Sequence, residues 1–346
     1  MNRLTTGDPA PLFIAPAKEN DTFRFATLAG RWVVLAFVPD LESLARLKAA
    51  AAGRPELNQD EHIVLFGVVP APLDVRFPPR CFADPDGTIA ASYGAATPQW
   101  ILLDPTLRVF AQGPISEPET LLRLATRLPA PGGHAGAPLN APVLLVPRVF
   151  EPGFCRTLID VYRAQGGEES GFMREVDGYT RLLTDPRHKQ RKDVIVEDSG
   201  LIDACRERIR RRLIPEIQKA FQFEATRMER YLVACYTAGA GWFRPHRDNT
   251  TKGTAHRKFA VSINLNAEEY QGGDLRFPEF GPRTYRPPTG GAVVFSCSLL
   301  HEATTVTTGE RYAFLPFLYD EAGAQVRQQN LSFVKLGEEA AAAPVS

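Results

Sequence analysis

The sequence lacks any apolar run long enough to cross a bilayer, any excess of one charge and any closely spaced pair of cysteines. Its strongest apolar runs, WVVLAFV and AVVFSC, are far shorter than the roughly 20 residues of a membrane-spanning helix, and MNRLTTGDPAP has no signal-like apolar region. Lys plus Arg and Asp plus Glu both total 40, so no global field favours nucleic acid or an anionic membrane. We therefore expect a soluble cytoplasmic protein that binds neither.

The cysteines are odd in number and widely scattered, at Cys81, Cys155, Cys205, Cys235 and Cys297. Such spacing argues against a disulfide framework and against a cysteine-ligated zinc site. We expect most of them to be small buried hydrophobic residues.

The length of 346 residues exceeds what one hydrophobic core usually supports, so two domains are expected. The clearest break is LPAPGGHAGAPLNAP, where Pro, Gly and Ala interrupt every helical or strand period. We place the domains at 1–128 and 143–335, with a linker at 129–142 and a flexible tail at 336–346.

The first domain alternates buried strands with helices. Continuous apolar runs predict strands at 32–38, 62–69 and 99–104, and helical spacing predicts helices at 41–52 and 117–128. Ser116 and Glu119 form a capping-box pattern at the start of the second helix. This alternation indicates an α/β fold with a partly parallel sheet.

Three stretches of this domain, TTGDPAPLFIAPAKENDTFRFATLAGRWVVLAFVPD, FADPDGTIAASYGA and TPQWILLDP, resemble the peroxiredoxin branch of the thioredoxin fold. That family keeps its peroxide-reducing cysteine just after the strand matched by WVVLAFVPD, where this chain reads LESLARLKA. Cys81 lies in a different segment. The resemblance therefore implies a thioredoxin-like domain that is non-catalytic and serves structure or partner binding.

The second half begins with helices and continues with short strands. Helical spacing covers 151–167 and one longer helix from 201 to 221, whose arginine cluster we interpret as a solvated face. The segment 171–193 is expected to be a long irregular loop that forms a lid. After residue 228, short apolar strands separated by Gly, Pro and Asn indicate an α+β domain with a β-sandwich or jelly-roll core.

The segment GWFRPHRDN places His246 and Asp248 two residues apart. On an extended strand such residues point to the same face, so imidazole and carboxylate converge. His301, at the end of the predicted strand GAVVFSCSLL, is the candidate third ligand, which a strand pair folded across a sandwich can bring opposite the first two. Two histidines and one carboxylate that leave coordination positions open are typical of iron(II) rather than zinc.

Arg311 lies ten residues after His301, in an otherwise apolar strand that a turn at TTGE brings back beside the metal. A permanently charged, planar guanidinium in such a strand needs a carboxylate partner. The distal carboxylate of 2-oxoglutarate would provide it.

The order HxD, SINLN, GGDLRFPEFG, AVVFSCSLLHEATTV and GERYAFLPFLYD resembles the prolyl 4-hydroxylase-like branch of the 2-oxoglutarate and iron(II)-dependent oxygenases. The resemblance implies a double-stranded β-helix (jelly-roll) core, catalytic iron ligands at His246, Asp248 and His301, and a 2-oxoglutarate anchor at Arg311. It also implies that Tyr236 and Asn264 contact 2-oxoglutarate. The implied cofactors are Fe(II), 2-oxoglutarate and dioxygen, with ascorbate as an accessory reductant.

By this resemblance the substrate is a prolyl or other residue of a peptide or protein, or a free amino acid, hydroxylated at an unactivated C–H bond. Two other functions stay open: a thiol-redox protein acting through the first domain, and a non-catalytic module that senses iron or oxygen. Halogenation requires a small residue in place of Asp248 and is disfavoured. His188 and His256 lie in basic, polar segments and are expected to be exposed rather than ligating.

Overall fold

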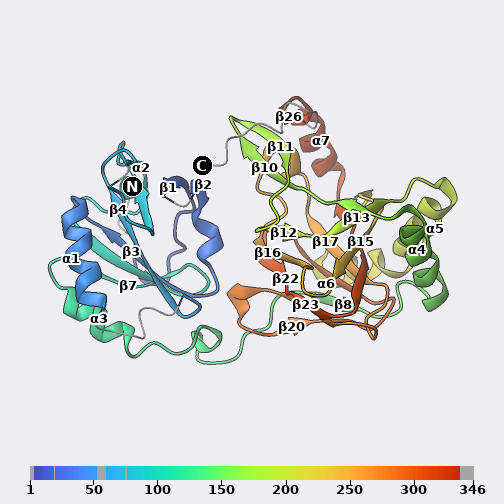
Figure 1. Cartoon of the computed structure of the whole chain (residues 1–346), viewed down its shortest axis with the longest axis horizontal. Coiled ribbons are helices and arrows are strands. Elements are labelled where there is room, and N and C mark those ends of the chain that lie inside the picture. The colour runs from blue at the N-terminus through green and yellow to red at the C-terminus, as the bar shows by residue number, and fades with distance from the viewer. Residues whose placement is uncertain (1–3, 19, 53–59, 75, 336–346) are drawn as a thin grey trace. The chain divides into compact units, whose positions relative to one another are not determined.

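The computed structural model describes residues 4–18, 20–52, 60–74 and 76–335 (Figure 1). The predicted tail at 336–346 lies outside the described residues. The chain divides into two compact units, the first comprising Met1–Ala141 with Phe277–Arg283 and the second Pro142–Arg276 with Thr284–Ser346. The first unit therefore includes nearly all of the segment predicted to be a linker, and a 3-10 helix forms there at Pro131–Gly133.

The first unit is built on a seven-stranded mixed sheet in the order β2-β1-β5-β4-β3-β6-β7. β3 pairs in parallel with β4, β4 pairs in parallel with β5, and β6 is antiparallel to β3, as the alternation of strands and helices predicts. The strands are β1 Ile14–Ala17, β2 Asn20–Arg24, β3 Trp32–Phe37, β4 Ile63–Val69, β5 Cys81–Ala83, β6 Gln99–Leu103 and β7 Val109–Pro114.

The α-helices in the described residues of this unit are α1 Leu41–Ala52, α2 Thr88–Ser92 and α3 Pro118–Ala125. α1 and α3 bury Leu44 and Leu121 in the same core as Trp32 and Trp100 of the sheet. The capping box predicted at Ser116 does not form, because Glu117 is the N-cap and accepts no side-chain hydrogen bond. Pro118 starts the helix instead, and its missing N–H costs nothing in the first turn.

The second unit consists mainly of β-sheet. One nine-stranded sheet contains the order β14-β25-β17-β24-β15-β13-β9, extended from β17 by β21 and β8, and a five-stranded sheet has the order β12-β16-β22-β19-β20. The strands of the large sheet are β8 Leu144–Val146, β9 Glu168–Glu169, β13 Lys192–Ile195, β14 Arg227–Glu229, β15 Leu232–Thr237, β17 Phe259–Asn264, β21 Ala292–Ser296, β24 Glu310–Phe314 and β25 Phe317–Tyr319. Those of the five-stranded sheet are β12 Lys189–Gln190, β16 Trp242–His246, β19 Leu275–Arg276, β20 Thr284–Tyr285 and β22 His301–Ala303.

The helix predicted at 201–221 is two helices, α5 Ser199–Arg212 and α6 Ile214–Phe221. The break falls at Leu213 because Pro215 in the first turn of α6 has no N–H to continue the hydrogen bonds of α5. Both helices keep the predicted apolar face, which packs with α4 Pro152–Gln165 in the core of the unit. A further helix, α7 Glu321–Gln329, follows β25.

The segment 171–193 is not the irregular loop that was predicted. Most of it forms an antiparallel hairpin of β10 Phe172–Val176 and β11 Tyr179–Leu183, and β26 Val334–Lys335 pairs with β11 in parallel. The hairpin turn at Asp177 and Gly178 uses positive φ at both residues, which Asp tolerates and Gly favours. Period-two alternation is weak here because every residue of β10 is only partly buried.

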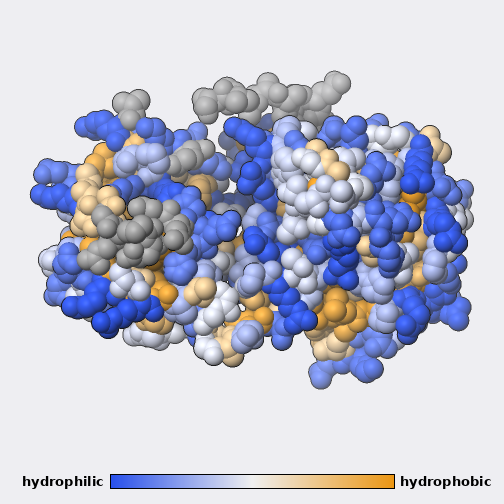
Figure 2. All heavy atoms as spheres, turned by 60° about the horizontal axis from the view of Figure 1, so that its bottom comes forward, coloured by the Kyte–Doolittle hydropathy of each residue, from blue (hydrophilic) through white to orange (hydrophobic). Residues whose placement is uncertain are grey.

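Hydrophobic residues on the face shown in Figure 2 form several separate patches among hydrophilic ones. The large exposed apolar side chains come from distant parts of the chain and are Leu12, Ile14, Phe110, Leu145, Leu182, Ile195 and Leu331. Scattered exposure of this kind is ordinary for a folded surface. In the part of the chain that the structure describes, no helix combines the length and apolar character needed to span a bilayer.

Substitution of Phe314 measures how much the core contributes to the stability of the second unit. It is fully buried on β24 and packs against Phe150, with ring centroids 5.5 Å apart. We expect Phe314→Ala to lower the free energy of unfolding of this unit by about 3–5 kcal/mol, because the cavity left behind cannot fully collapse. Urea denaturation followed by circular dichroism, with the two units fitted as separate transitions, measures the change.

Ile195→Ala is the matched control, because this side chain is 55% exposed on the same sheet. Its effect should stay within about 0.5 kcal/mol. A loss below about 1 kcal/mol for Phe314→Ala would contradict the role given to this side chain.

Candidate metal centre

Neighbouring strands of the five-stranded sheet bring the two histidines together. β16 and β22 pair antiparallel, with His246 directly opposite His301. Sequence reasoning placed His301 at the end of the strand before it, on the far side of a sandwich. Instead β21 ends at Ser296 and His301 begins β22, in the same sheet as His246.

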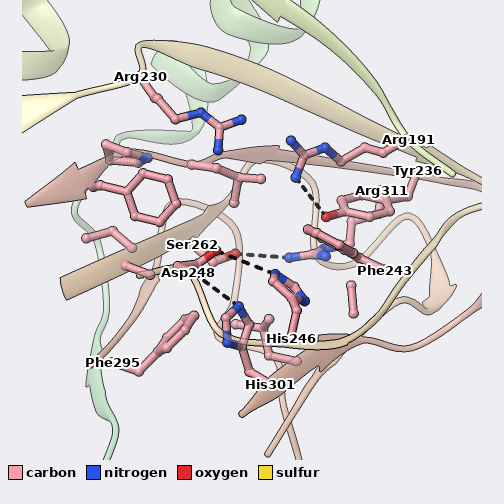
Figure 3. A pocket seen from close by; sticks show the side chains of 17 residues that line it. Arg191, Arg230, Tyr236, Phe243, His246, Asp248, Ser262, Phe295, His301 and Arg311 are labelled. Atoms are coloured by element: carbon pink, nitrogen blue, oxygen red, sulfur yellow. Dashed lines mark hydrogen bonds and ion pairs between the residues drawn. The ribbon is translucent and has the colours of Figure 1, made fainter. Parts of the chain in front are cut away.

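Asp248 lies just beyond the end of β16 rather than on the strand itself. Its backbone N–H donates to the Cys297 carbonyl over 3.0 Å, which fixes the carboxylate beside the two imidazoles. Asp248 Oδ1 lies 3.5 Å from His246 Nε2, and Asp248 Oδ2 lies 3.3 Å from His301 Nε2. One ligand atom from each of the three residues lies within 4.8 Å of the others. The structure thus brings the three predicted ligands together (Figure 3).

Each imidazole is oriented through its other ring nitrogen. His246 Nδ1 lies 2.8 Å from the Arg244 carbonyl and His301 Nδ1 lies 3.0 Å from the Leu299 carbonyl. A carbonyl oxygen only accepts hydrogen bonds, so each Nδ1 carries the proton. Both Nε2 atoms therefore point toward the carboxylate, the orientation found in metal-ligating histidines, in which Nε2 binds the metal and Nδ1 donates to a carbonyl.

The local electrostatics favour a charged carboxylate at this site at neutral pH. Burial, followed by the proximity of His301, lowers the pKa of His246 to about 4, so that imidazole is neutral. Burial alone would raise the pKa of Asp248, but the two histidines more than offset it and hold the pKa well below its ordinary value. A cation between these atoms, either a proton or a metal ion, can satisfy the carboxylate and the imidazole nitrogens, which lie 3.3–3.5 Å apart.

Arg311 lies in the same pocket, on β24 beside Tyr236 of β15, its register partner. Its side chain is only 2% exposed. Nη2 donates to Ser262 Oγ over 3.0 Å, whereas Nε and Nη1 are buried and have no hydrogen-bond partner among the described residues. A buried guanidinium with free donors is costly unless a ligand completes it, so these donors indicate an anion-binding position.

Tyr236 lines the pocket and Asn264 does not. The Tyr236 ring lies 4.9 Å from the Arg311 guanidinium, and its hydroxyl accepts a hydrogen bond from Arg191 over 3.2 Å. The Asn264 amide donates to the Pro287 carbonyl over 2.7 Å, away from the pocket. Among the described residues, those that line the pocket are Arg191, Arg230, Tyr236, Phe243, His246, Asp248, Ala260, Val261, Ser262, Leu275, Phe295, His301, Ala303, Arg311, Leu315, Pro316 and Phe317.

Sequence reasoning missed Arg191, Arg230 and Ser262. Arg191 stands in the run RHKQRKD, which looked like a solvated basic segment, yet its side chain is 6% exposed. β17 is buried at every residue after Phe259, so its apolar run could have indicated that Ser262 is buried, but not that its hydroxyl meets Arg311.

The expectation that His256 and His188 are exposed is wrong for His256 and only partly right for His188. His256 is 2% exposed, with Nε2 lying 3.0 Å from Glu229 Oε2. His188 is half-buried between the rings of Phe172 and Phe243. Burial lowers the pKa of His188 to about 4. Neither belongs to the metal-binding set.

All five cysteines are buried and unbridged. Cys81 of the first unit has no exposed surface. A thiol that acts on peroxide or on a disulfide must be accessible as a thiolate, so the buried Cys81 disfavours thiol-redox catalysis.

Asp248→Asn tests the metal centre directly. The amide keeps the shape of the side chain but removes the negative charge that offsets a divalent cation. Loss of outer-shell partners alone costs about 10–100-fold in metal affinity, so we expect a loss of at least 100-fold for this ligand. Titration with Fe(II) under anaerobic conditions measures it, and His62→Gln in the first unit is the control. Equal affinity in wild type and Asp248→Asn would exclude Asp248 as a ligand.

Glu229 makes the second unit sensitive to acid. Burial alone would raise its pKa, but hydrogen bonding to His256 and the charge of Arg257 lower it to about 2 from an ordinary 4.5. Because the folded pKa is the lower one, this stabilisation is complete above pH 4.5 and is lost as the pH falls toward 2. The contribution is on the order of 3 kcal/mol.

We therefore expect the unfolding free energy of wild type to fall more steeply than that of Glu229→Gln between these pH values. Denaturant titrations across this range measure both slopes. Parallel slopes would show that the pKa of Glu229 is not depressed in the folded protein.

No family model matches the chain. Over 88 residues it is 31% identical to a PKHD-type hydroxylase of Synechococcus sp. (strain JA-2-3B'a(2-13)), a match that covers 24% of this chain and 39% of the relative. Over 65 residues it is 38% identical to a PKHD-type hydroxylase of Shewanella frigidimarina (strain NCIMB 400), covering 18% of this chain and 29% of the relative. The chain thus spans at most 39% of the length of these curated relatives.

Solved structures with some likeness include a Pseudomonas putida prolyl-4-hydroxylase, 18% identical, with a TM-score of 0.38 over 52% of this chain and 93% of that one. Another is a prolyl hydroxylase from Trichoplax adhaerens in complex with a hypoxia inducible factor peptide fragment, 16% identical, with a TM-score of 0.40 over 61% of this chain and 94% of that one. Scores this low carry no structural argument. What these comparisons show is that part of the chain is similar in sequence to PKHD-type hydroxylases.

Proposed function

We propose that the second unit is an iron(II)- and 2-oxoglutarate-dependent dioxygenase that hydroxylates an unactivated C–H bond. The observation that carries this proposal is one pocket that holds both a His-Asp-His set and a buried arginine with free donors. The sequence similarity to PKHD-type hydroxylases supports it.

The three ligands suit ferrous iron. Two imidazoles and one carboxylate offer three ligand atoms on one side of a cation and leave other coordination positions open. A closed zinc site would need a fourth ligand, and the metal-binding set found among the described residues has three members.

Arg311, Ser262 and Tyr236 fit 2-oxoglutarate. The free Nε and Nη1 of Arg311 match a distal carboxylate, and Ser262 fixes the guanidinium through Nη2. The Tyr236 hydroxyl, oriented by Arg191, lies at the same wall. Because its amide is bonded to Pro287, Asn264 has no part in this proposed site.

Iron bound here with 2-oxoglutarate and dioxygen would supply the oxidising chemistry, with ascorbate as an accessory reductant. The chain's own part is to hold the metal, to orient the cosubstrate and to keep water out. Apolar side chains line the pocket for the last task, namely Phe243, Leu275, Phe295, Leu315 and Phe317. We propose a prolyl or other residue of a peptide or protein, or a free amino acid, as the substrate.

For the first unit we propose a thioredoxin-like fold without catalysis of its own, which acts through a protein partner. Its parallel β3-β4-β5 core with antiparallel β6 fits that fold, and the buried Cys81 fits the loss of thiol chemistry.

Consumption of 2-oxoglutarate tests the function. Protein loaded with Fe(II) should form succinate from 2-oxoglutarate in the presence of oxygen, and Arg311→Ala should weaken 2-oxoglutarate binding by at least about 10-fold, the value of one charge-assisted hydrogen bond. Calorimetric titration with 2-oxoglutarate measures the affinity, and mass spectrometry measures succinate.

His246→Ala should abolish succinate formation, whereas Arg227→Gln should leave it intact, since Arg227 pairs with Glu321 on the exposed surface. Normal 2-oxoglutarate affinity in Arg311→Ala would remove its assigned role. Binding of 2-oxoglutarate without any succinate would favour the sensing module instead.

A further inference from the structure

We propose that the pocket contains a second anion-binding position at Arg230, which recognises a carboxylate of the substrate. This proposal rests on the hydroxylase function and deepens it, because it names a chemical group that the substrate carries next to the reacting position. The carboxylate is either the side chain of an acidic residue or a main-chain carboxylate.

Arg230 lines the pocket but lacks a hydrogen-bonded carboxylate of its own. Its Nη2 lies 3.7 Å from Asp193 Oδ2, which is longer than a hydrogen bond. That oxygen already accepts from Arg191 Nη2 over 2.6 Å and from the Ser170 hydroxyl. The N–H donors of Arg230 are therefore available to a ligand.

The three arginines of the pocket differ in their pairing and exposure. Arg191 is committed to Asp193 and Tyr236, so it positions other side chains. Arg311 is 2% exposed and lies deep, which suits a cosubstrate that binds before the substrate. The Arg230 side chain is 31% exposed, so a later ligand can reach it. In the view of Figure 3, Arg230 and Arg191 stand on one side of the pocket and the two histidines on the other.

The charges of the pocket leave Arg230 uncompensated. An iron(II) ion, the dianion 2-oxoglutarate, Asp248 and Arg311 together carry no net charge, and Arg191 is neutralised by Asp193. Arg257 is likewise neutralised by Glu229. Burial, with the nearby charges of Arg191 and Arg257, lowers the pKa of Arg230 to about 10, so it stays charged at neutral pH. Arg230 therefore keeps a positive charge that no carboxylate of the pocket balances at hydrogen-bonding distance.

The backbone holds Arg230 in a conformation that a non-glycine residue rarely adopts. Its φ is +66°, in the short turn between β14 and β15. Both neighbours are fixed, because Glu229 pairs with Arg257 over 2.7 Å and the Tyr231 carbonyl accepts from Val196 over 2.8 Å. Backbone strain that is kept at a pocket wall is typical of residues placed for ligand contact.

The Phe317 ring shapes the floor of this position. The Arg230 guanidinium lies 5.3 Å from the ring centroid, and Arg257 lies 4.0 Å from the same ring. Cation–π contacts hold a guanidinium without using its N–H donors. The Arg230 guanidinium is therefore held in place while its N–H donors stay available. This is the condition for binding a planar carboxylate with two hydrogen bonds.

Ligand-observed NMR titrations on the full chain test the proposal. The protein is loaded with Zn(II), which is redox-inert, and with saturating 2-oxoglutarate, so that Arg311 is occupied. One probe pair compares acetyl-Ala-Pro-Glu-amide with acetyl-Ala-Pro-Gln-amide. A second pair compares acetyl-Gly-Ala-Pro bearing a free C-terminus with its amide, and the pair that shows a preference identifies the source of the carboxylate.

We expect the carboxylate member of at least one pair to bind about tenfold tighter than its neutral partner, as for one charge-assisted hydrogen bond. Arg230→Gln should reduce this ratio to about one, whereas Arg227→Gln, which changes an exposed arginine three residues earlier, should keep it. Gln222 already adopts a φ of +51°, so glutamine is compatible with the turn at residue 230. Melting temperatures confirm that both variants are folded.

Equal affinities within both pairs, absence of binding by every probe, or a preference that survives Arg230→Gln would overturn the proposal. So would a loss of 2-oxoglutarate affinity in Arg230→Gln as large as that in Arg311→Ala, because Arg230 would then belong to the cosubstrate site. Failure of wild type to bind 2-oxoglutarate at all would instead count against the proposed function, and the calorimetric titration shows that outcome separately.

Discussion

Three side chains that can bind a cation meet in a buried place. His246 Nε2 and His301 Nε2 face the two oxygens of Asp248 at 3.5 and 3.3 Å, and both Nδ1 atoms are turned toward backbone carbonyls. A cation between these atoms, either a proton or a metal ion, can satisfy the carboxylate and the imidazole nitrogens together. The pairing of β16 with β22 and the backbone hydrogen bond from Asp248 to Cys297 hold the three side chains together, so the sheet contributes the energy that brings the ligands close.

The large sheet places a second ligand-binding group, the Arg311 guanidinium, in the same pocket. β24 lies between β15 and β17, and this order places Arg311 beside Tyr236 and within reach of Ser262. A cation site and an incompletely bonded guanidinium therefore share one apolar-walled space. A ligand that offers oxygen atoms to a metal at one end and a carboxylate at the other satisfies both. In the proposed function, Arg311 would thus link the metal chemistry to the choice of cosubstrate.

Local sequence patterns predicted most of the helices and strands. The features that were not predicted had weak local signals or depend on contacts between side chains far apart in the sequence. Apolar runs located β3, β4, β6, β15, β17 and β24 because buried strands need continuous or alternating apolar residues. The ligands were identifiable because histidine, aspartate and arginine at that spacing have few structural reasons to occur together. The helix break at Leu213 and the hairpin at 172–183 are local features whose signals were weak or overlooked, namely Pro215 and a partly buried strand, whereas the burial of His256 depends on a contact with a distant segment. His256 reads as a polar loop residue until Glu229, 27 residues away, supplies its partner.

The sequence did not predict where charged side chains are buried, and the structure explains why. The chain has equal numbers of acidic and basic residues, so no charge preference is visible globally. The run RHKQRKD suggests a solvated surface, yet Lys189 and Arg191 are 4% and 6% exposed and stand behind and beside the pocket. Their charges are costly to bury, and Asp193 can neutralise only one of the cations around it. A protein of zero net charge can therefore keep a local surplus of positive charge, and here that surplus lies at the wall of the pocket that contains the candidate metal ligands.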